Sequence, residues 1–189
     1  MPRSAAGIPV WDRPVRLLHW ALAACSLGAL GTGLWAPEWW LDRHALIGAG
    51  AGLAVLLRLA WGIAGGGAAR FTAWPLSPRA ALAQVRDALR GRAEPAFGHP
   101  PAGAWSALVL LGLVASAVVS GAVAYGGQEG LGPLAPLVGG AVGAAAAGAH
   151  EILAWALLAA VGLHLAGVLV ESRLLGESLP LSMMTGRRR

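Results

Sequence analysis

Four long apolar segments, almost free of charge, constrain this chain more than any other feature. As helices rising about 1.5 Å per residue, segments of this length can cross the hydrocarbon core of a bilayer. The whole chain of 189 residues is 57% hydrophobic, which lies outside the usual range of soluble domains. The sequence therefore predicts an all-α integral membrane protein, a bundle of four transmembrane helices at about residues 15–35, 43–64, 102–125 and 147–171.

The segments between the spans predict the remaining organisation of a single membrane domain, residues 1–189. Residues 65–101 are polar and arginine-rich, and we expect a cytoplasmic loop with a short helix over 78–90. Residues 126–146 are apolar, but Pro133, Pro136 and the pair Gly139-Gly140 interrupt them. We therefore expect an extracytoplasmic loop with a short helix there, and no fifth span.

The arginines predict the orientation in the membrane. All fourteen basic residues are arginine, and only Arg43 and Arg58 fall away from the side that holds the two termini and the 65–101 loop. The positive-inside rule places that side, with both termini, in the cytoplasm. Because these arginines are divided among separate segments, from Arg3 to Arg189, they predict no nucleic-acid partner.

Histidines within the apolar segments are the candidate site residues. His150 and His164 are fourteen residues apart, so on one helix they are separated by about 21 Å along the axis and about 40° around it. With the predicted topology, His19 and His164 lie towards the cytoplasm, and His44 and His150 lie towards the outside. Two histidine pairs at two depths are expected.

Such imidazole pairs, with no carboxylate or thiolate beside them, suit haem iron better than zinc, which usually takes further protein ligands. Cys25 is the only cysteine, and no CxxCH motif is present for covalent haem attachment. We expect these histidines to ligate two haems that are not covalently attached. The alternative is that the histidines are hydrogen-bonded membrane residues of a haem-free transporter or assembly protein.

Three further residues are candidates for contact with haem propionates or quinone. Arg58 lies on nearly the same helix face as His44, fourteen residues further on, at the level of the inner haem. Arg16 and His99 lie near the cytoplasmic boundary. The alternatives are a snorkelling Arg58, a positive-inside anchor at Arg16, and an interfacial histidine at His99.

Several motifs, in this order and at these spacings, are similar to those of the bacterial cytochrome b561 family, which includes relatives among the b-type subunits of membrane hydrogenases. They are VWDRPVRLLHW, HALIGAGAGLAVLLRLAWG, ARFTAWPLSP, GHPPAGA, GPLAPLV, HEILAWALLAAVGLH and MMTGRR. The resemblance implies a multi-pass protein of the bacterial inner membrane, in contact with lipid. It also implies two b haems on His19, His44, His150 and His164. Two departures are Glu171, where many relatives have a histidine, and Pro100, where the usual motif reads GHNP.

The resemblance implies electron transfer between an extracytoplasmic partner, such as a cytochrome c, and the quinone pool, with an oligomer possible. One alternative is the membrane anchor of a hydrogenase or dehydrogenase; another is a superoxide:quinone oxidoreductase. The predicted outer surface carries four carboxylates against Arg43, whereas superoxide would be steered by positive charge. The charge therefore favours a partner with a basic docking face. The carboxylates are Glu38, Asp42, Glu129 and Glu151.

Overall fold

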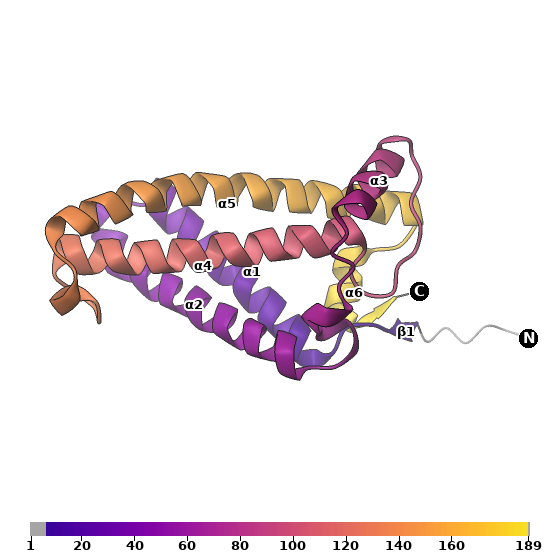
Figure 1. The fold of residues 1–189 in the computed structure, drawn as a ribbon, viewed down its shortest axis with the longest axis horizontal. Helices are drawn as coiled ribbons and strands as arrows, with labels where there is room; N and C mark the ends of the chain where they lie inside the picture. The colour runs from indigo at the N-terminus through magenta and orange to yellow at the C-terminus, as the bar shows by residue number, and fades with distance from the viewer. Residues whose placement is uncertain (1–6, 189) are drawn as a thin grey trace, which may run out of the picture. The chain divides into compact units, whose positions relative to one another are not determined.

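The structure, a computed structural model of the chain, describes residues 7–188 and is dominated by four long helices. Over these residues, four helical stretches are long and apolar enough to cross a membrane. The all-α membrane fold predicted from the sequence is confirmed. Arg3 and Arg189, which contribute to the predicted orientation, lie outside the described residues. The long helices are α1 (Arg13–Trp35), α2 (Leu41–Ala64), α4 (Pro101–Glu129) and α5 (Gly140–Leu175) (Figure 1).

The chain forms two compact units, each of which is described by itself. The first contains the segments near both termini and the 65–101 loop, and the second contains the remaining parts of the four long helices. The first unit is Met1–His19, Arg58–Leu108 and Val161–Arg189, and the second is Trp20–Leu57 and Val109–Ala160.

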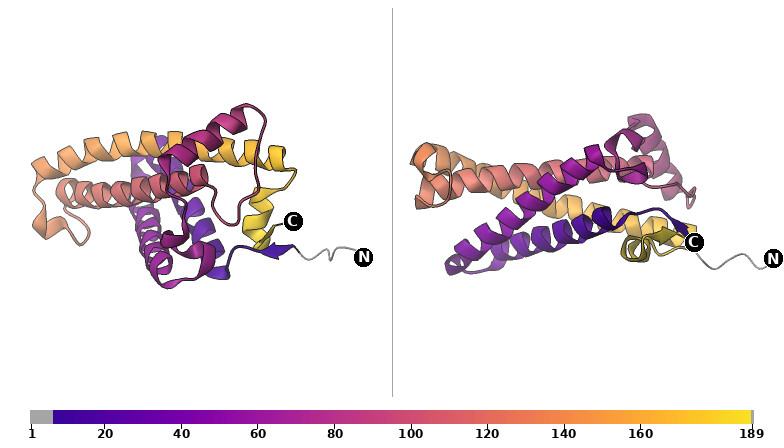
Figure 2. Two further views of the ribbon diagram at one scale, coloured as in Figure 1. Left: turned by 45° about the vertical axis from the view of Figure 1, so that its right-hand side comes forward. Right: turned by 90° about the horizontal axis from the view of Figure 1, so that it is seen from below.

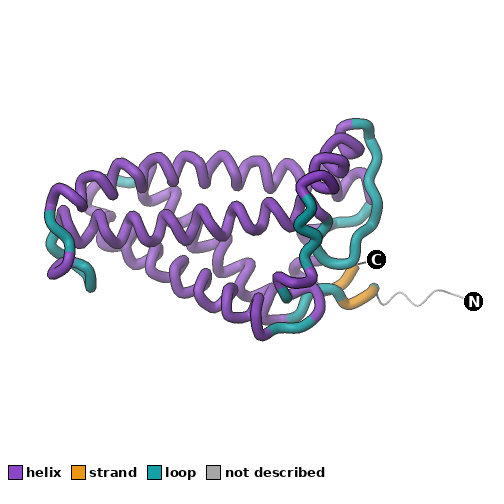
Figure 3. The backbone as a smooth tube through the Cα atoms, viewed as in Figure 1, coloured by secondary structure: helices purple, strands orange, loops and turns teal. Residues whose placement is uncertain are grey.

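In the first unit, the two ends of the described chain pair with each other. Strand β1 (Ile8–Pro9) runs antiparallel to β2 (Arg187–Arg188), and Figures 1, 2 and 3 show the two strands side by side. Helix α6 (Leu179–Thr185) ends just before β2, where Gly186 adopts a left-handed conformation with φ of 81°. This pairing joins the two ends of the described part of the chain.

The loop of the first unit contains short helices held by local capping. It comprises η2 (Gly67–Ala69), η3 (Phe71–Ala73) and α3 (Pro78–Leu89), which matches the short helix expected over 78–90. Ser77 accepts a hydrogen bond from the Ala80 amide, and Pro78 stands at the first helical position. Gln84 attaches α3 to the start of α4, because its Oε1 accepts from the Ala102 amide at 2.8 Å.

In the second unit, small residues let helix backbones approach closely. A Cβ atom added to Gly127 on α4 would lie 2.6 Å from the Cα of Gly143 on α5. A Cβ on Gly52 of α2 would lie 2.9 Å from a methyl group of Val118. These contacts fit the close packing that small residues permit between membrane helices.

The extracytoplasmic loop expected at 126–146 is shorter in the structure. Helix α4 continues to Glu129 and α5 already begins at Gly140, so only the intervening residues lack α-helix. Within them, η4 (Ala135–Leu137) is a single 3-10 turn, and η1 (Glu38–Trp40) is another between α1 and α2. Alanine-rich residues from Ala141 to Ala149 have high helix propensity, and the prolines break the helix only where they stand.

Candidate functional site

His44 and His150 lie beside each other in the second unit. Their ring centroids are 5.8 Å apart and their ring planes are inclined by 79°. His44 comes from the first turns of α2, and His150 comes from the first half of α5. Two imidazoles from separate membrane helices thus converge in one place.

The Nδ1 atom of His44 is held by helix α1. It lies 3.1 Å from the carbonyl oxygen of Ala29 and 3.1 Å from Thr32 Oγ1. The Thr32 hydroxyl donates its own proton to the Gly28 carbonyl at 2.7 Å, so towards His44 it acts as an acceptor. Gly33 completes the contact, since a Cβ there would lie 2.8 Å from His44 Cε1.

Helix α4 holds His150 in the same way. Its Nδ1 atom lies 2.9 Å from the carbonyl oxygen of Ala117 and 3.2 Å from Ser120 Oγ. The Ser120 hydroxyl donates to the Ala117 carbonyl at 3.1 Å, and a Cβ on Gly121 would lie 2.9 Å from His150 Cε1.

These contacts determine the tautomer of both rings. A carbonyl oxygen can only accept a hydrogen bond, so Nδ1 must carry the proton in each neutral imidazole. The second ring nitrogen, Nε2, then keeps its lone pair. In its neutral form each imidazole therefore has one nitrogen free to bind a metal.

His19 and His164 both belong to the first unit. His164 Nδ1 lies 3.3 Å from Ser106 Oγ on α4, and His19, near the start of α1, belongs to the same unit. The structure therefore places the two histidines of this pair in one unit and those of the other pair in the other.

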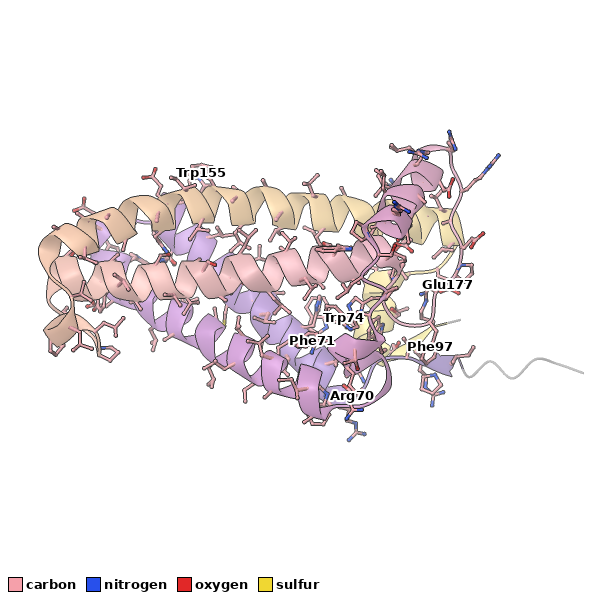
Figure 4. All side chains as sticks on the ribbon, in the orientation of Figure 1. Arg70, Phe71, Trp74, Phe97, Trp155 and Glu177 are labelled. Atoms are coloured by element: carbon pink, nitrogen blue, oxygen red, sulfur yellow. The ribbon has the colours of Figure 1, made fainter. Side chains whose placement is uncertain are left out.

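Arg58 is a buried cation in the first unit. Its side chain is 5% exposed, and one nitrogen, Nη2, donates to the Ala69 carbonyl at 3.3 Å. The guanidinium carbon lies 4.9 Å from the ring centroid of Phe71 and 5.3 Å from that of Trp74, two side chains labelled in Figure 4. Its other terminal nitrogen, Nη1, is buried and makes no hydrogen bond. A buried guanidinium with an unused donor suits an anionic partner.

His99 packs between two tryptophans near Arg58. Its ring centroid lies 4.8 Å from that of Trp11 and 4.5 Å from that of Trp74. Burial lowers the pKa of His99 from its ordinary value of 6.5 to about 4. The nearby positive charge of Arg58 contributes further, as do His19 and His164. His99 Nδ1 is buried and makes no hydrogen bond, so this ring offers a second unused polar atom.

Arg16 contacts the C-terminal part of the first unit. Its Nη2 donates to the carbonyl of Met184 in α6, and its Nη1 lies near Gly186. Its Nε atom is buried without a partner. The contacts of Arg16 therefore fix the end of the chain against the start of α1.

The sequence contains a pattern that indicates the contacts of His44 and His150, which the spacing between the histidines alone does not reveal. Both helices that hold a histidine carry the pattern Ala-x-x-Thr/Ser-Gly, at Ala29–Gly33 and at Ala117–Gly121. Small residues on membrane helices usually indicate helix packing. Here they contact imidazole rings, and comparing the two segments could have identified them.

Within the described residues, no group of three or more histidine, cysteine, aspartate or glutamate side chains could hold a metal ion. The histidines occur instead in pairs, which is the ligand number that haem iron takes from a protein in a bis-histidine site. This combination of apolar helices and histidine pairs is typical of a helical membrane cytochrome of the b type.

The comparison with known families agrees. The family model for prokaryotic cytochrome b561 matches residues 10–186, so the chain belongs to this family. It is a multi-pass bacterial membrane protein, a b-type cytochrome that binds b-type haem and takes part in electron transfer. No curated protein and no solved structure matches the chain.

Proposed function

We propose that this cytochrome binds two b haems and passes electrons between an extracytoplasmic redox partner and the quinone pool. His44 and His150 would hold one haem, and His19 and His164 the other. The observation that carries the proposal is the convergence of His44 and His150, with both Nδ1 atoms engaged by carbonyls and both Nε2 atoms left free.

The donor set fits haem in its chemistry. Each pair supplies two neutral nitrogen ligands, and no carboxylate or thiolate group among the described residues completes a site for zinc. When bound by two such histidines, haem would supply one-electron chemistry. The chain's own residues orient the rings of His44 and His150 through their Nδ1 atoms.

Arg58 would neutralise a propionate of the haem held by His19 and His164, and His99, uncharged near neutral pH, would donate a hydrogen bond to it. Arg58 Nη1 and His99 Nδ1 are buried polar atoms without partners, and an anion would satisfy both of them. A quinone carbonyl could accept from the same atoms, and the two ligands differ in charge. Arg16 stays a candidate for the same role: its Nη2 donates to the Met184 carbonyl, and its Nε is buried without a partner.

We further propose that both termini and the 65–101 loop face the cytoplasm, because most of the arginines lie on that side. The His44–His150 pair then lies towards the outside, near the surface that carries Glu38, Asp42 and Glu129. That surface favours a partner with a basic docking face, such as a cytochrome c, over superoxide. Copurification with an iron-sulfur subunit would instead identify the anchor of a hydrogenase or dehydrogenase.

Reduced-minus-oxidised absorbance spectra of single variants test the ligand assignment. His44→Gly or His150→Gly should remove one component of the α-band and leave the other, and His19→Gly or His164→Gly should remove the complementary component. Added imidazole should restore the lost component by filling the vacated position, which separates loss of a ligand from loss of the fold. Ser26→Ala, a buried change on α1, is the control. Equal loss of both components from His44→Gly would contradict the pairing.

A further inference from the structure

The histidines of the second unit are held by two matching brackets. One consists of Ala29, Thr32 and Gly33 on α1, and the other consists of Ala117, Ser120 and Gly121 on α4. Each bracket presents the same three features to the ring that it contacts. These are a carbonyl within 3.1 Å of Nδ1, a hydroxyl within 3.2 Å of it, and a glycine against Cε1.

The spacing explains why one helix segment can supply all three. The hydroxyl residue comes three positions after the alanine, and the glycine comes four positions after the alanine. On a helix all three residues therefore lie on one face. The hydroxyl bonds back to a carbonyl of its own helix, Thr32 to Gly28 and Ser120 to Ala117. That bond orients the oxygen lone pairs towards the imidazole.

The glycine is needed because the ring occupies the space of its side chain. A Cβ at Gly33 or Gly121 would approach the ring at 2.8 or 2.9 Å, closer than carbon atoms normally pack. By contrast, a Cβ on Gly31, two residues earlier on α1, would meet no atom within 4 Å. The close approach therefore belongs to the bracket glycine and is not a general property of this helix.

We infer that Thr32 and Ser120 are positioning residues that lower the reduction potential of the haem held by His44 and His150. This inference rests on the proposed function, which assigns these histidines as ligands. A ligand imidazole that donates its Nδ1 proton to an acceptor becomes a stronger electron donor through Nε2, and stronger donation stabilises the oxidised metal. Each bracket supplies two acceptors to one ligand.

Equilibrium redox titration of the purified holoprotein, followed at the α-band, tests the inference. Thr32→Val and Ser120→Ala remove one acceptor each and keep the carbonyl. Each variant should move the midpoint potential of one component, the one lost in His44→Gly, to a more positive value. The double variant should move it further. Thr32→Ser should restore the wild-type potential, because it restores the hydroxyl. Ser26→Ala should leave both potentials unchanged.

Selective loss of the same component from Thr32→Val, with retention in Thr32→Ser, would also support a positioning role. The inference would be overturned if the potential of that component stayed unchanged within replicate error, or if both components moved equally. Wild-type protein without haem would overturn the proposed function and this inference together. A normal two-component titration with unmoved potentials would overturn the inference alone.

Discussion

The Nδ1 atom of His150 lies 2.9 Å from the carbonyl oxygen of Ala117, and this single contact fixes the chemistry of the ring. The proton must lie on Nδ1, and Nε2 is left as a base. His44 stands in the same relationship to Ala29, at 3.1 Å. The backbones of α1 and α4 thus orient two membrane imidazoles in the way that the proposed ligation requires.

Enlarging either bracket glycine should displace the ring that it contacts. Gly33→Ala and Gly121→Ala place a methyl group against His44 and His150, respectively, and overpacking of this kind costs about 1–3 kcal/mol. We expect each variant to retain less of the haem ascribed to this pair, measured as haem per polypeptide after purification. Gly31→Ala is the matched control and should retain the wild-type amount. Equal retention in all three variants would show that the rings have room to move.

Neutralising Arg58 should lower one reduction potential. A buried positive charge favours the reduced, less positive state of a nearby redox centre, and Arg58 belongs to the same unit as His19 and His164. For Arg58→Gln we expect a shift of about 40 mV to more negative potential, equivalent to about 1 kcal/mol for one electron. Redox titration measures it, and Arg70→Gln, an exposed change in the following loop, should have no effect. A shift confined to the component ascribed to His44 and His150 would contradict the assignment of Arg58 to the haem held by His19 and His164.

Protonation of His99 should make the folded protein less stable in acid. Its pKa is about 4 in the folded protein and 6.5 as an ordinary value, so between these values the unfolded chain binds more protons. The contribution of His99 to the free energy of unfolding is fully present above pH 6.5. It is lost as the pH falls towards 4, and the loss is about 3 kcal/mol at most. Arg58, His19 and His164 are the charged or titratable groups around it.

Thermal unfolding measured across this pH range checks the prediction. The wild-type protein should lose stability more steeply between pH 6.5 and 4 than His99→Gln, which cannot take up the proton. Since the other histidines titrate in both proteins, only the difference between the two curves is attributed to His99. Parallel curves would mean that His99 is protonated normally in the folded state.

Electron exchange with a small basic cytochrome c should weaken as salt is added. The proposed docking surface is acidic, and attraction between exposed charges is screened within about 10 Å at 0.1 M ionic strength. We expect the second-order rate constant to fall with increasing ionic strength, measured by stopped-flow absorbance. The fall should be shallower in the Glu38→Gln/Glu129→Gln double variant. Rates independent of salt in the wild-type protein would remove the support for a basic partner.

Local sequence patterns predict the four long helices because a membrane span needs a charge-free run, and such runs are visible without tertiary information. The ends of the helices are harder to predict from the sequence. The expected loop at 126–146 is too long because Pro133 and Pro136 break the helix only locally, while the alanines after Gly140 continue it. A proline therefore indicates that the helix is interrupted but does not show how long the non-helical segment is.

The candidate site likewise has features that the sequence predicts and features that it does not. Helical periodicity places His150 and His164 at two depths, and this leads to the expected pairs. Contacts between residues distant in sequence leave no such periodic signal. Ser106 beside His164 and Trp11 beside His99 therefore emerge only from the folded chain. The pairing of β1 with β2 is a third example, since it joins the two ends of the chain.

The ratio of haem to polypeptide in the purified wild-type protein tests the central proposal most directly. Haem extracted as its pyridine complex and protein measured by amino-acid analysis give the ratio without reference to any variant. Two pairs of histidines, one in each unit, predict two b haems per chain. A reproducible ratio of one under haem-replete expression would leave one pair without its proposed role, and a ratio of zero would contradict the proposal as a whole.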